Sequence, residues 1–179
     1  MPSAGQALWK TTRTLAIVIG LAGCGLNASS MVPEAMPTRA NPIDEDVAIR
    51  TVSGEHDTTV NGAVLVTNAD LREALVLSLE QSKLFRSVRS NNPTVYLDAI
   101  IRRQDQRPIP PSEHRATVAV EYRFYRTNGG DEPIWDESFL SDGGSTIQPT
   151  AVREKLARQA ALRDNLRAML TLVERTWPR

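Results

Sequence analysis

Three stretches of the chain alternate apolar and polar residues with a period of two, which is typical of half-buried β-strands. They cover residues 95–102, 116–125 and 135–140. Between the second and third stretches, Asn128-Gly129-Gly130-Asp131 has the composition of a tight turn, so we expect these two stretches to form a hairpin. Apolar residues within 46–54 predict a further strand that precedes the other three.

Two other segments repeat apolar residues at helical spacing. Residues 68–85 place Leu71 and Leu75 on one face, and Asn68 occupies the expected N-cap position. Residues 151–176 form a long amphipathic helix, whose wide apolar face and mixed charges favour packing on a sheet over lying on a membrane. The order of the elements predicts an α+β fold. We expect a two-layer sandwich: a mainly antiparallel sheet of about four strands with two helices on one face.

The N-terminal residues have the features of an export signal. Lys10 and Arg13 precede a short apolar run over 15–20, which is too short to span a bilayer. The run leads into Leu21-Ala22-Gly23-Cys24, which resembles a bacterial lipobox. In proteins with that motif the cysteine is acylated and becomes the first residue of the mature chain. We therefore expect Cys24 to be a lipidation site; an ordinary signal or anchor with a chance cysteine is the alternative.

This interpretation divides the chain into three parts. Residues 1–23 are the expected lipoprotein signal peptide, residues 24–44 a flexible tether with several prolines, and residues 45–179 a single α+β domain. Removing the signal takes away two basic residues and no acidic one, so the mature chain carries a net charge of −2. Near-neutrality argues against a nucleic-acid partner. With one cysteine in the chain and that one lipidated, no disulfide is available.

One segment has the composition of a binding loop. Residues 104–115 contain three prolines and predict a connection between strands. Arg103, Arg107 and Arg115 lie in or beside it and offer forked donors to carboxylate or phosphate groups. We interpret them as a candidate partner-binding surface, whose ligand could be a protein, a lipid phosphate or a polyanionic envelope polymer. The alternative is a solvated connector whose acidic neighbours balance the arginines.

The sequence holds little that indicates catalysis or metal binding. The two histidines, His56 and His114, fall in predicted loops, and neither has a partner at metal-ligand spacing. Ser145 follows two glycines that predict a turn, and the sequence places no histidine near it. We therefore expect no metal, no cofactor and no enzymatic activity.

Several stretches of the chain together resemble a family of small bacterial envelope lipoproteins, the YajG-like group. They span most of the predicted mature chain and are Val52-Ser53-Gly54, Asn68-Ala69-Asp70-Leu71-Arg72-Glu73-Ala74-Leu75, Ser78-Leu79-Glu80, Leu84-Phe85, Tyr96-Leu97-Asp98-Ala99, residues 118–125, the Trp135 strand and the arginine-rich last helix. The layout is also similar to that of lipoproteins that assist envelope lipid transporters. The resemblance implies no catalytic residues, and it implies an outer-membrane lipoprotein.

The expected function is that of a non-enzymatic, lipid-anchored envelope lipoprotein on the periplasmic face of the outer membrane. Gly25 supports this membrane, because an aspartate after the acylated cysteine is, in many such bacteria, a signal for retention in the inner membrane. The protein would act as a binding or assembly accessory for an envelope protein partner, held to the membrane by the lipid on Cys24. Two alternatives remain: a lipid-binding auxiliary subunit of an envelope transport system, and a periplasmic hydrolase.

Overall fold

The computed structural model describes residues 27–37, 39, 41–54, 59–60, 63–64, 66–88, 91–109, 112–148 and 150–178. In these ranges the chain forms eight strands and helices of four or more residues and one short hairpin. They are η1 (Ala28–Met31), β1 (Ile43–Gly54), β2 (Thr59–Val60), β3 (Ala63–Val64), α1 (Asn68–Ser82), β4 (Phe85–Val88), β5 (Val95–Ile109), β6 (Glu113–Arg126), β7 (Trp135–Ser145) and α2 (Thr150–Thr176).

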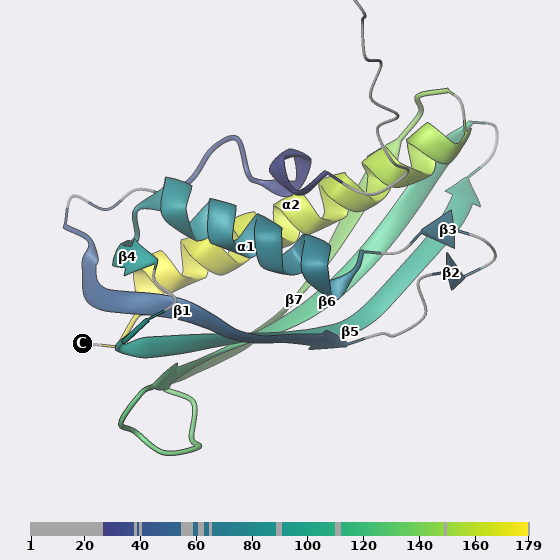
Figure 1. Cartoon of the computed structure of the whole chain (residues 1–179). Coiled ribbons are helices and arrows are strands. Elements are labelled where there is room, and N and C mark those ends of the chain that lie inside the picture. The colour runs from purple at the N-terminus through teal and green to yellow at the C-terminus, as the bar shows by residue number, and fades with distance from the viewer. Residues whose placement is uncertain are drawn as a thin grey trace, which may run out of the picture.

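The main sheet has five strands in the order β4-β1-β5-β6-β7, and Figure 1 shows both long helices on one of its faces. The α+β class and the two-layer arrangement are therefore confirmed. The expectation of about four mainly antiparallel strands is corrected to a mixed sheet: β1 runs parallel to both β4 and β5, whereas β5, β6 and β7 are antiparallel. The missed strand is β4, which has only four residues and follows α1 so closely that its Phe85 read as the end of the helix.

The two helices bury their apolar faces against different strands. α1 begins at a capping box in which Thr67, rather than the expected Asn68, is the N-cap and pairs with Asp70. It contacts β1 and β4, whereas α2 crosses β6 and β7. Leu166 and Leu170 of α2 are fully buried, which confirms that this helix packs on the sheet.

The range expected to be a flexible tether contains folded structure. Asn27 caps the short helix η1 by accepting a hydrogen bond from the Ser29 backbone N–H (3.1 Å). Met31 has no exposed surface, and the segment contacts both α1 and α2. From there the chain leads to β1, which starts at Ile43. A 24–44 tether is thus wrong for its described residues, because apolar side chains among its prolines are buried against the helices.

The segment expected to be a proline loop is also different. β5 continues to Ile109 and β6 starts at Glu113, so residues 104–109 and 113–115 belong to a long antiparallel hairpin. Pro108 is accommodated opposite His114 in this pairing. A bulge between Ile101 and Arg103 shifts the alternation by one residue, which hid the continuing strand from a period-two pattern.

α2 approaches β7 closely at Gly143, which lies inside the strand and not in the turn that its sequence predicted. A Cβ atom placed on Gly143 would lie 2.1 Å from the Ala157 carbonyl oxygen of the helix. Ala157 and Ala161 provide the matching small surface on α2. Glycine is required here because no side chain fits between the two backbones.

A buried polar bridge holds the same two layers together further along. The Tyr122 hydroxyl on β6 donates to the Asn165 side-chain oxygen on α2 (2.8 Å), and the Asn165 amide nitrogen donates to the Phe139 carbonyl on β7 (2.8 Å). Burial raises the pKa of Tyr122, so the hydroxyl stays a donor. The bridge fixes the position of α2 over both strands.

Gly143→Ala should destabilise the fold, because the added methyl group meets helix backbone that cannot move aside. We expect a loss of about 1–3 kcal/mol in the free energy of unfolding, measured by urea denaturation. Gly144→Ala is the matched control, since its Cβ would be tight only against the flexible Glu113 side chain at 3.0 Å and would lie at ordinary contact distance, 3.8 Å, from the His114 carbonyl oxygen. Equal stability of the two variants would contradict the close packing of α2 on β7.

Candidate functional site

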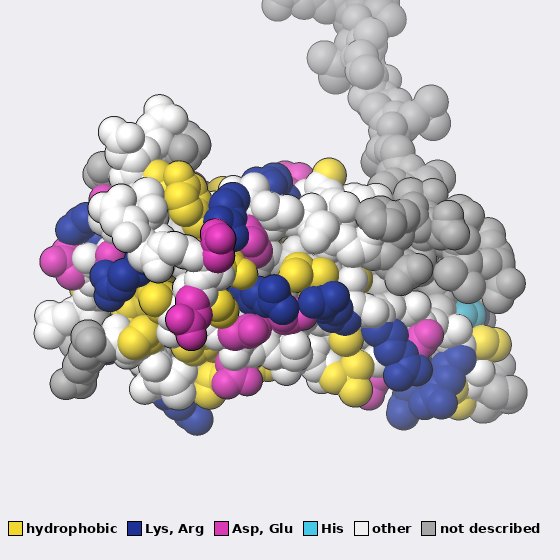
Figure 2. All heavy atoms as spheres, turned by 90° about the horizontal axis from the view of Figure 1, so that it is seen from below, with side chains coloured by type: hydrophobic (Ala, Val, Ile, Leu, Met, Phe, Trp, Pro, Cys, Tyr) yellow, Lys and Arg dark blue, Asp and Glu magenta, His cyan; other side chains and the backbone are white. Residues whose placement is uncertain are grey.

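The face of the sheet opposite the helices carries the charged side chains that strand alternation directs outward. Figure 2 looks onto this open face from below, and basic and acidic groups interleave along it, with the basic groups gathered at its right-hand end. That end is the β5–β6 hairpin tip in Figure 1. The open face is therefore the polar surface of the sheet, and the helices cover the other face.

The middle of the open face is electrostatically paired. Arg50 forms two hydrogen bonds with the Asp98 carboxylate (3.0 and 2.6 Å), and its guanidinium lies 4.4 Å from the centre of the Tyr125 ring. Arg102 and Arg123 both bind the Glu121 carboxylate. Burial raises the pKa of Glu121, but the hydrogen bonds from the two arginines outweigh it, and the pKa lies below its ordinary value.

At the tip, the three arginines singled out in the sequence line a single hollow of about 380 Å³. Arg107 on β5 stands opposite Arg115 on β6, and Arg103 lies earlier on β5. The three side chains therefore lie close together, held by strands and not by a loop, and their role in binding a partner stays a prediction. The rest of the lining is Asp105, Gln106, Thr117, Leu140 and Asp142.

The charges in and beside the hollow balance, with three arginines against Asp105, Glu113 and Asp142, but they are not all joined in ion pairs. Arg103 pairs with Asp105, and Arg115 pairs with Glu113 at 2.8 Å. Asp142 accepts a hydrogen bond from the Thr117 hydroxyl. Within the part of the chain that the structure describes, Arg107 forms no ion pair. Its exposed guanidinium can therefore take an added carboxylate or phosphate without breaking an existing contact.

Leu140 adds an apolar element that sequence reasoning missed. It is 65% exposed and lies on β7 opposite Ala119. Strand alternation already placed Leu140 on the face opposite Phe139, and this was the signal that could have identified it. An exposed leucine beside arginines is the combination found in protein interfaces, where apolar burial supplies affinity and charge supplies orientation.

His114 lies on the other face of the hairpin, so its expected place in a loop is wrong. It is 7% exposed, and its Nε2 atom is 3.5 Å from Glu154 on α2. It stands opposite Ser145 on β7, but no hydrogen bond joins the two side chains; the Ser145 hydroxyl accepts from the Ile147 backbone N–H instead. The contact between nucleophile and base that a serine hydrolase needs is not made here.

Arg158 of α2 shares this interior position. It is 4% exposed and donates to the Gln106 side-chain oxygen, and burial lowers its pKa. The Arg158 Nε and His114 Nδ1 atoms have no hydrogen-bond partner within the described ranges. The arrangement links α2 to the strand that carries Arg107.

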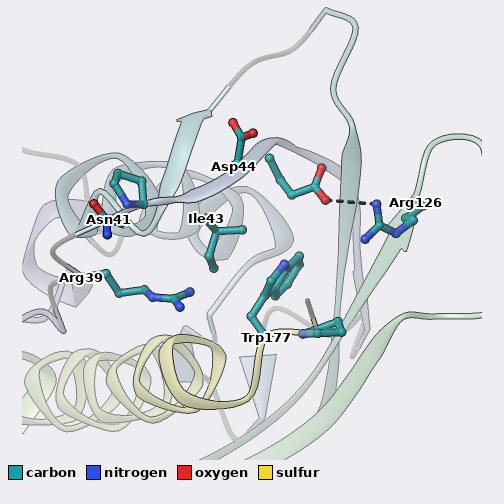
Figure 3. A pocket seen from close by; sticks show the side chains of 9 residues that line it. Arg39, Asn41, Ile43, Asp44, Arg126 and Trp177 are labelled. Atoms are coloured by element: carbon teal, nitrogen blue, oxygen red, sulfur yellow. Dashed lines mark ion pairs between the residues drawn. The ribbon is translucent and has the colours of Figure 1, made fainter.

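A second hollow, of about 320 Å³, lies at the opposite end of β6 (Figure 3). Its apolar floor includes Ile43 and Trp177, and the Trp177 ring stacks edge-on against Phe124 with centroids 5.0 Å apart. Arg126 at its rim pairs with Glu45 (3.2 Å). The aromatic floor closes the end of the core, and this hollow contains none of the predicted site residues.

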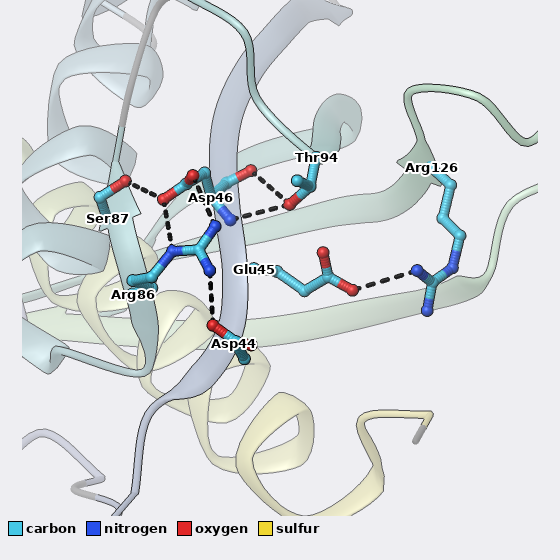
Figure 4. A network of polar contacts seen from close by, with 7 residues as sticks. All are labelled: Asp44, Glu45, Asp46, Arg86, Ser87, Thr94 and Arg126. Atoms are coloured by element: carbon cyan, nitrogen blue, oxygen red, sulfur yellow. Dashed lines mark hydrogen bonds and ion pairs between the residues drawn. The ribbon is translucent and has the colours of Figure 1, made fainter.

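The same end holds a dense carboxylate network that ties the short strand β4 to β1 (Figure 4). Arg86 donates to both Asp46 carboxylate oxygens (3.1 and 2.7 Å) and to Asp44 (2.5 Å). Thr94 accepts from the Asp46 backbone N–H at 2.8 Å, which connects the network to the start of β5. These contacts give the buried Asp46 carboxylate its hydrogen-bond donors, and we assign the network a structural role.

Other predicted positions lie outside the described residues. Cys24 and His56 are among them, so the lipidation site stays a prediction. Within the described ranges no group of three or more potential metal-binding side chains comes together. In the same ranges, each helix is either too short or too polar to cross a bilayer.

Comparison with known proteins identifies the fold. No protein-family model and no curated protein matches the chain. Among solved structures, protein XCC0632 from Xanthomonas campestris, described as DUF330, is similar with a TM-score of 0.55 and 17% identity, over 80% of this chain and 89% of that one. The hypothetical protein CT253 from Chlamydia trachomatis gives a TM-score of 0.56 and 11% identity, over 78% and 96%.

A more distant similarity is to a minor lipoprotein from Acinetobacter baumannii, with a TM-score of 0.45 and 11% identity over 69% of this chain and 91% of that one. At these identities the first two structures establish a shared fold, and the third adds no argument to it. A function for this chain has to be inferred from the side chains on its own surface.

Glu121→Gln should lower stability in a pH-dependent way, because its pKa is depressed in the folded state. The carboxylate contributes stability above the ordinary glutamate pKa of about 4.3, and this contribution is lost as the pH falls through the lower folded value. We expect the variant to melt at lower temperature than the original protein at pH 7, with the difference closing under acid. Thermal melts across that range test this, and a difference independent of pH would refute it.

Proposed function

We propose that this protein is a non-enzymatic envelope lipoprotein, anchored by acyl chains on Cys24, that binds an acidic segment of a partner protein at the hairpin tip. In this role it acts as a binding or assembly accessory on the periplasmic face of the outer membrane. The YajG-like resemblance supports the envelope setting. The single observation that carries the binding role is the hollow in which Arg107, beside the exposed Leu140, forms no ion pair with any residue that the structure describes.

A carboxylate-rich peptide fits the hollow better than a free ion does. A guanidinium can form two parallel hydrogen bonds with a carboxylate, and the hollow offers Arg107 and Arg115 directly opposite each other across the hairpin. Leu140 can bury an apolar side chain of the same peptide. Asp105 and Asp142 in the lining disfavour a polyanion of high charge density, since it would meet both carboxylates.

The alternative role, a lipid carrier, requires space between the sheet and the helices. Along the middle of that interface the side chains are fully buried: Val120 and Leu97 from the strands and Leu166 and Leu170 from α2 belong to one core cluster. An acyl chain there would have to displace well-packed core residues. We therefore favour the binding accessory.

Cys24→Ala should abolish acylation and leave an uncleaved precursor. Metabolic labelling with a clickable fatty acid, followed by membrane fractionation, measures both effects. Since each buried methylene contributes about 0.8 kcal/mol, several acyl chains hold the protein firmly on the membrane, and the variant should lose this attachment mode. Unlabelled original protein with a free Cys24 thiol would overturn the lipoprotein proposal.

Replacing Arg103, Arg107 and Arg115 together by Gln should abolish partner binding without unfolding the protein, because all three side chains are exposed. A photo-reactive phenylalanine analogue at position 140 provides the readout in intact cells. We expect the yield of protein adducts to fall at least about tenfold, which corresponds to about 1.4 kcal/mol. Peptide mapping should place the adduct on a segment rich in Asp and Glu.

The matched control removes the same charge from α2, with Lys155, Arg167 and Arg175 changed to Gln. This variant should retain the adducts at position 140. Adducts that persist in the tip variant, or that map to lipid or to a basic segment, would overturn the proposed binding role.

A further inference from the structure

The first described element of the chain, η1, lies on the outer side of the helix layer. η1 contacts α1 and α2, and Figure 1 shows it above them, on the side away from the sheet. Arg163 of α2 donates from Nε and Nη2 to the Ser30 carbonyl (3.1 and 2.7 Å). Together with the buried Met31, these bonds fix the chain at this place on the domain.

Cys24 is separated from this fixed point by very little chain. Three residues lead from Cys24 to Asn27, the cap of η1. Even a fully extended chain spans at most about 3.6 Å per residue, so the two positions are no more than about 11 Å apart. The lipid attachment point is thus restricted to the neighbourhood of the helix layer, and the domain cannot turn freely beneath a long tether.

We propose that the outer surface of the α1–η1–α2 layer rests against the phospholipid headgroups of the membrane that holds the acyl chains, with the open face of the sheet directed away from it. This orientation rests on the lipidation of Cys24 in the proposed function. The occupant of the helix surface is the hydrated headgroup layer, because the lipid anchor emerges there.

The side chains on this surface suit headgroup contact without insertion. Glu73 on α1 and Asp164 and Arg167 on α2 are exposed. Asp164 and Arg167 pair at 2.9 Å. A mixed, paired surface is compatible with zwitterionic headgroups and costly to bury in hydrocarbon. In this orientation the Arg107 hollow faces the aqueous side, so an acidic protein can reach it and headgroups of the anchoring membrane cannot.

The experiment places single thiols on the two faces of the lipidated protein. Cys24 is the only cysteine, and acylation removes its thiol, so an introduced cysteine is the one site for a fluorophore. Acyl-labelled protein is incorporated into vesicles of phosphatidylethanolamine and phosphatidylglycerol that contain a lipid with a nitroxide on its headgroup. Fluorophores at E73C and D164C should lose most of their emission, whereas one at S138C on the open face should keep most of it.

A length control tests the cause. Inserting about twelve Gly and Ser residues between Leu26 and Asn27 gives a flexible reach of roughly 20 Å, so the difference in quenching between the two faces should collapse. Equal quenching of both faces in the original chain, or a difference that survives the insertion, would overturn the proposal. Acylation is established before the quenching measurement, so such a result refutes only the proposed orientation. The lipid anchor is tested by acyl labelling, and partner binding is tested by the adducts at position 140.

Discussion

The contact between α2 and the strands β6 and β7 is the constraint on which the rest of the structure depends. Gly143 lets the helix backbone meet the strand, and Asn165 joins Tyr122 to Phe139 across the same contact. On its side of the sheet this helix buries Leu162, Leu166, Met169, Leu170 and Val173. Because it is held by backbone contact and by a satisfied polar bridge, its direction over the sheet is fixed.

Both long helices cover one face of the sheet, so the other face is exposed and carries polar and charged side chains. Its middle is occupied by arginine–carboxylate pairs that compensate each other, as around Glu121. The charged groups in such pairs already have partners, so they add little to the affinity for another protein. At the hairpin tip Arg103 and Arg115 are paired as well, but Arg107 forms no ion pair among the described residues. The middle of the open face and the hairpin tip both contain arginines, and they differ in whether each arginine has a carboxylate partner.

In the proposed arrangement, the position of η1 determines which layer of the domain faces the membrane. A long tether would have made the two faces equivalent toward the membrane. The contacts of η1 with α1 and α2 make them different, since the first described residues of the chain lie on the helix side. The proposed binding surface and the proposed membrane surface then lie on opposite layers, and the protein could hold a partner at a fixed distance from the membrane.

The sequence by itself determined the class of the fold, because periods of two and 3.6 residues report directly which side of each strand and helix is buried. It also singled out Arg103, Arg107 and Arg115 as a candidate surface, since their side-chain chemistry is known without coordinates; the structure shows that they line one hollow. Tertiary structure decided what local patterns do not encode. Residues 104–109 and 113–115, expected in a proline loop, are paired strands. The bulge after Ile101 shifts the alternation of apolar and polar residues, so the period-two pattern does not reveal them. Gly143, expected in a turn, serves a close helix contact, and the expected tether is docked through Met31. In each case the deciding interaction joins residues far apart in the chain, and its energy comes from packing that no local window contains.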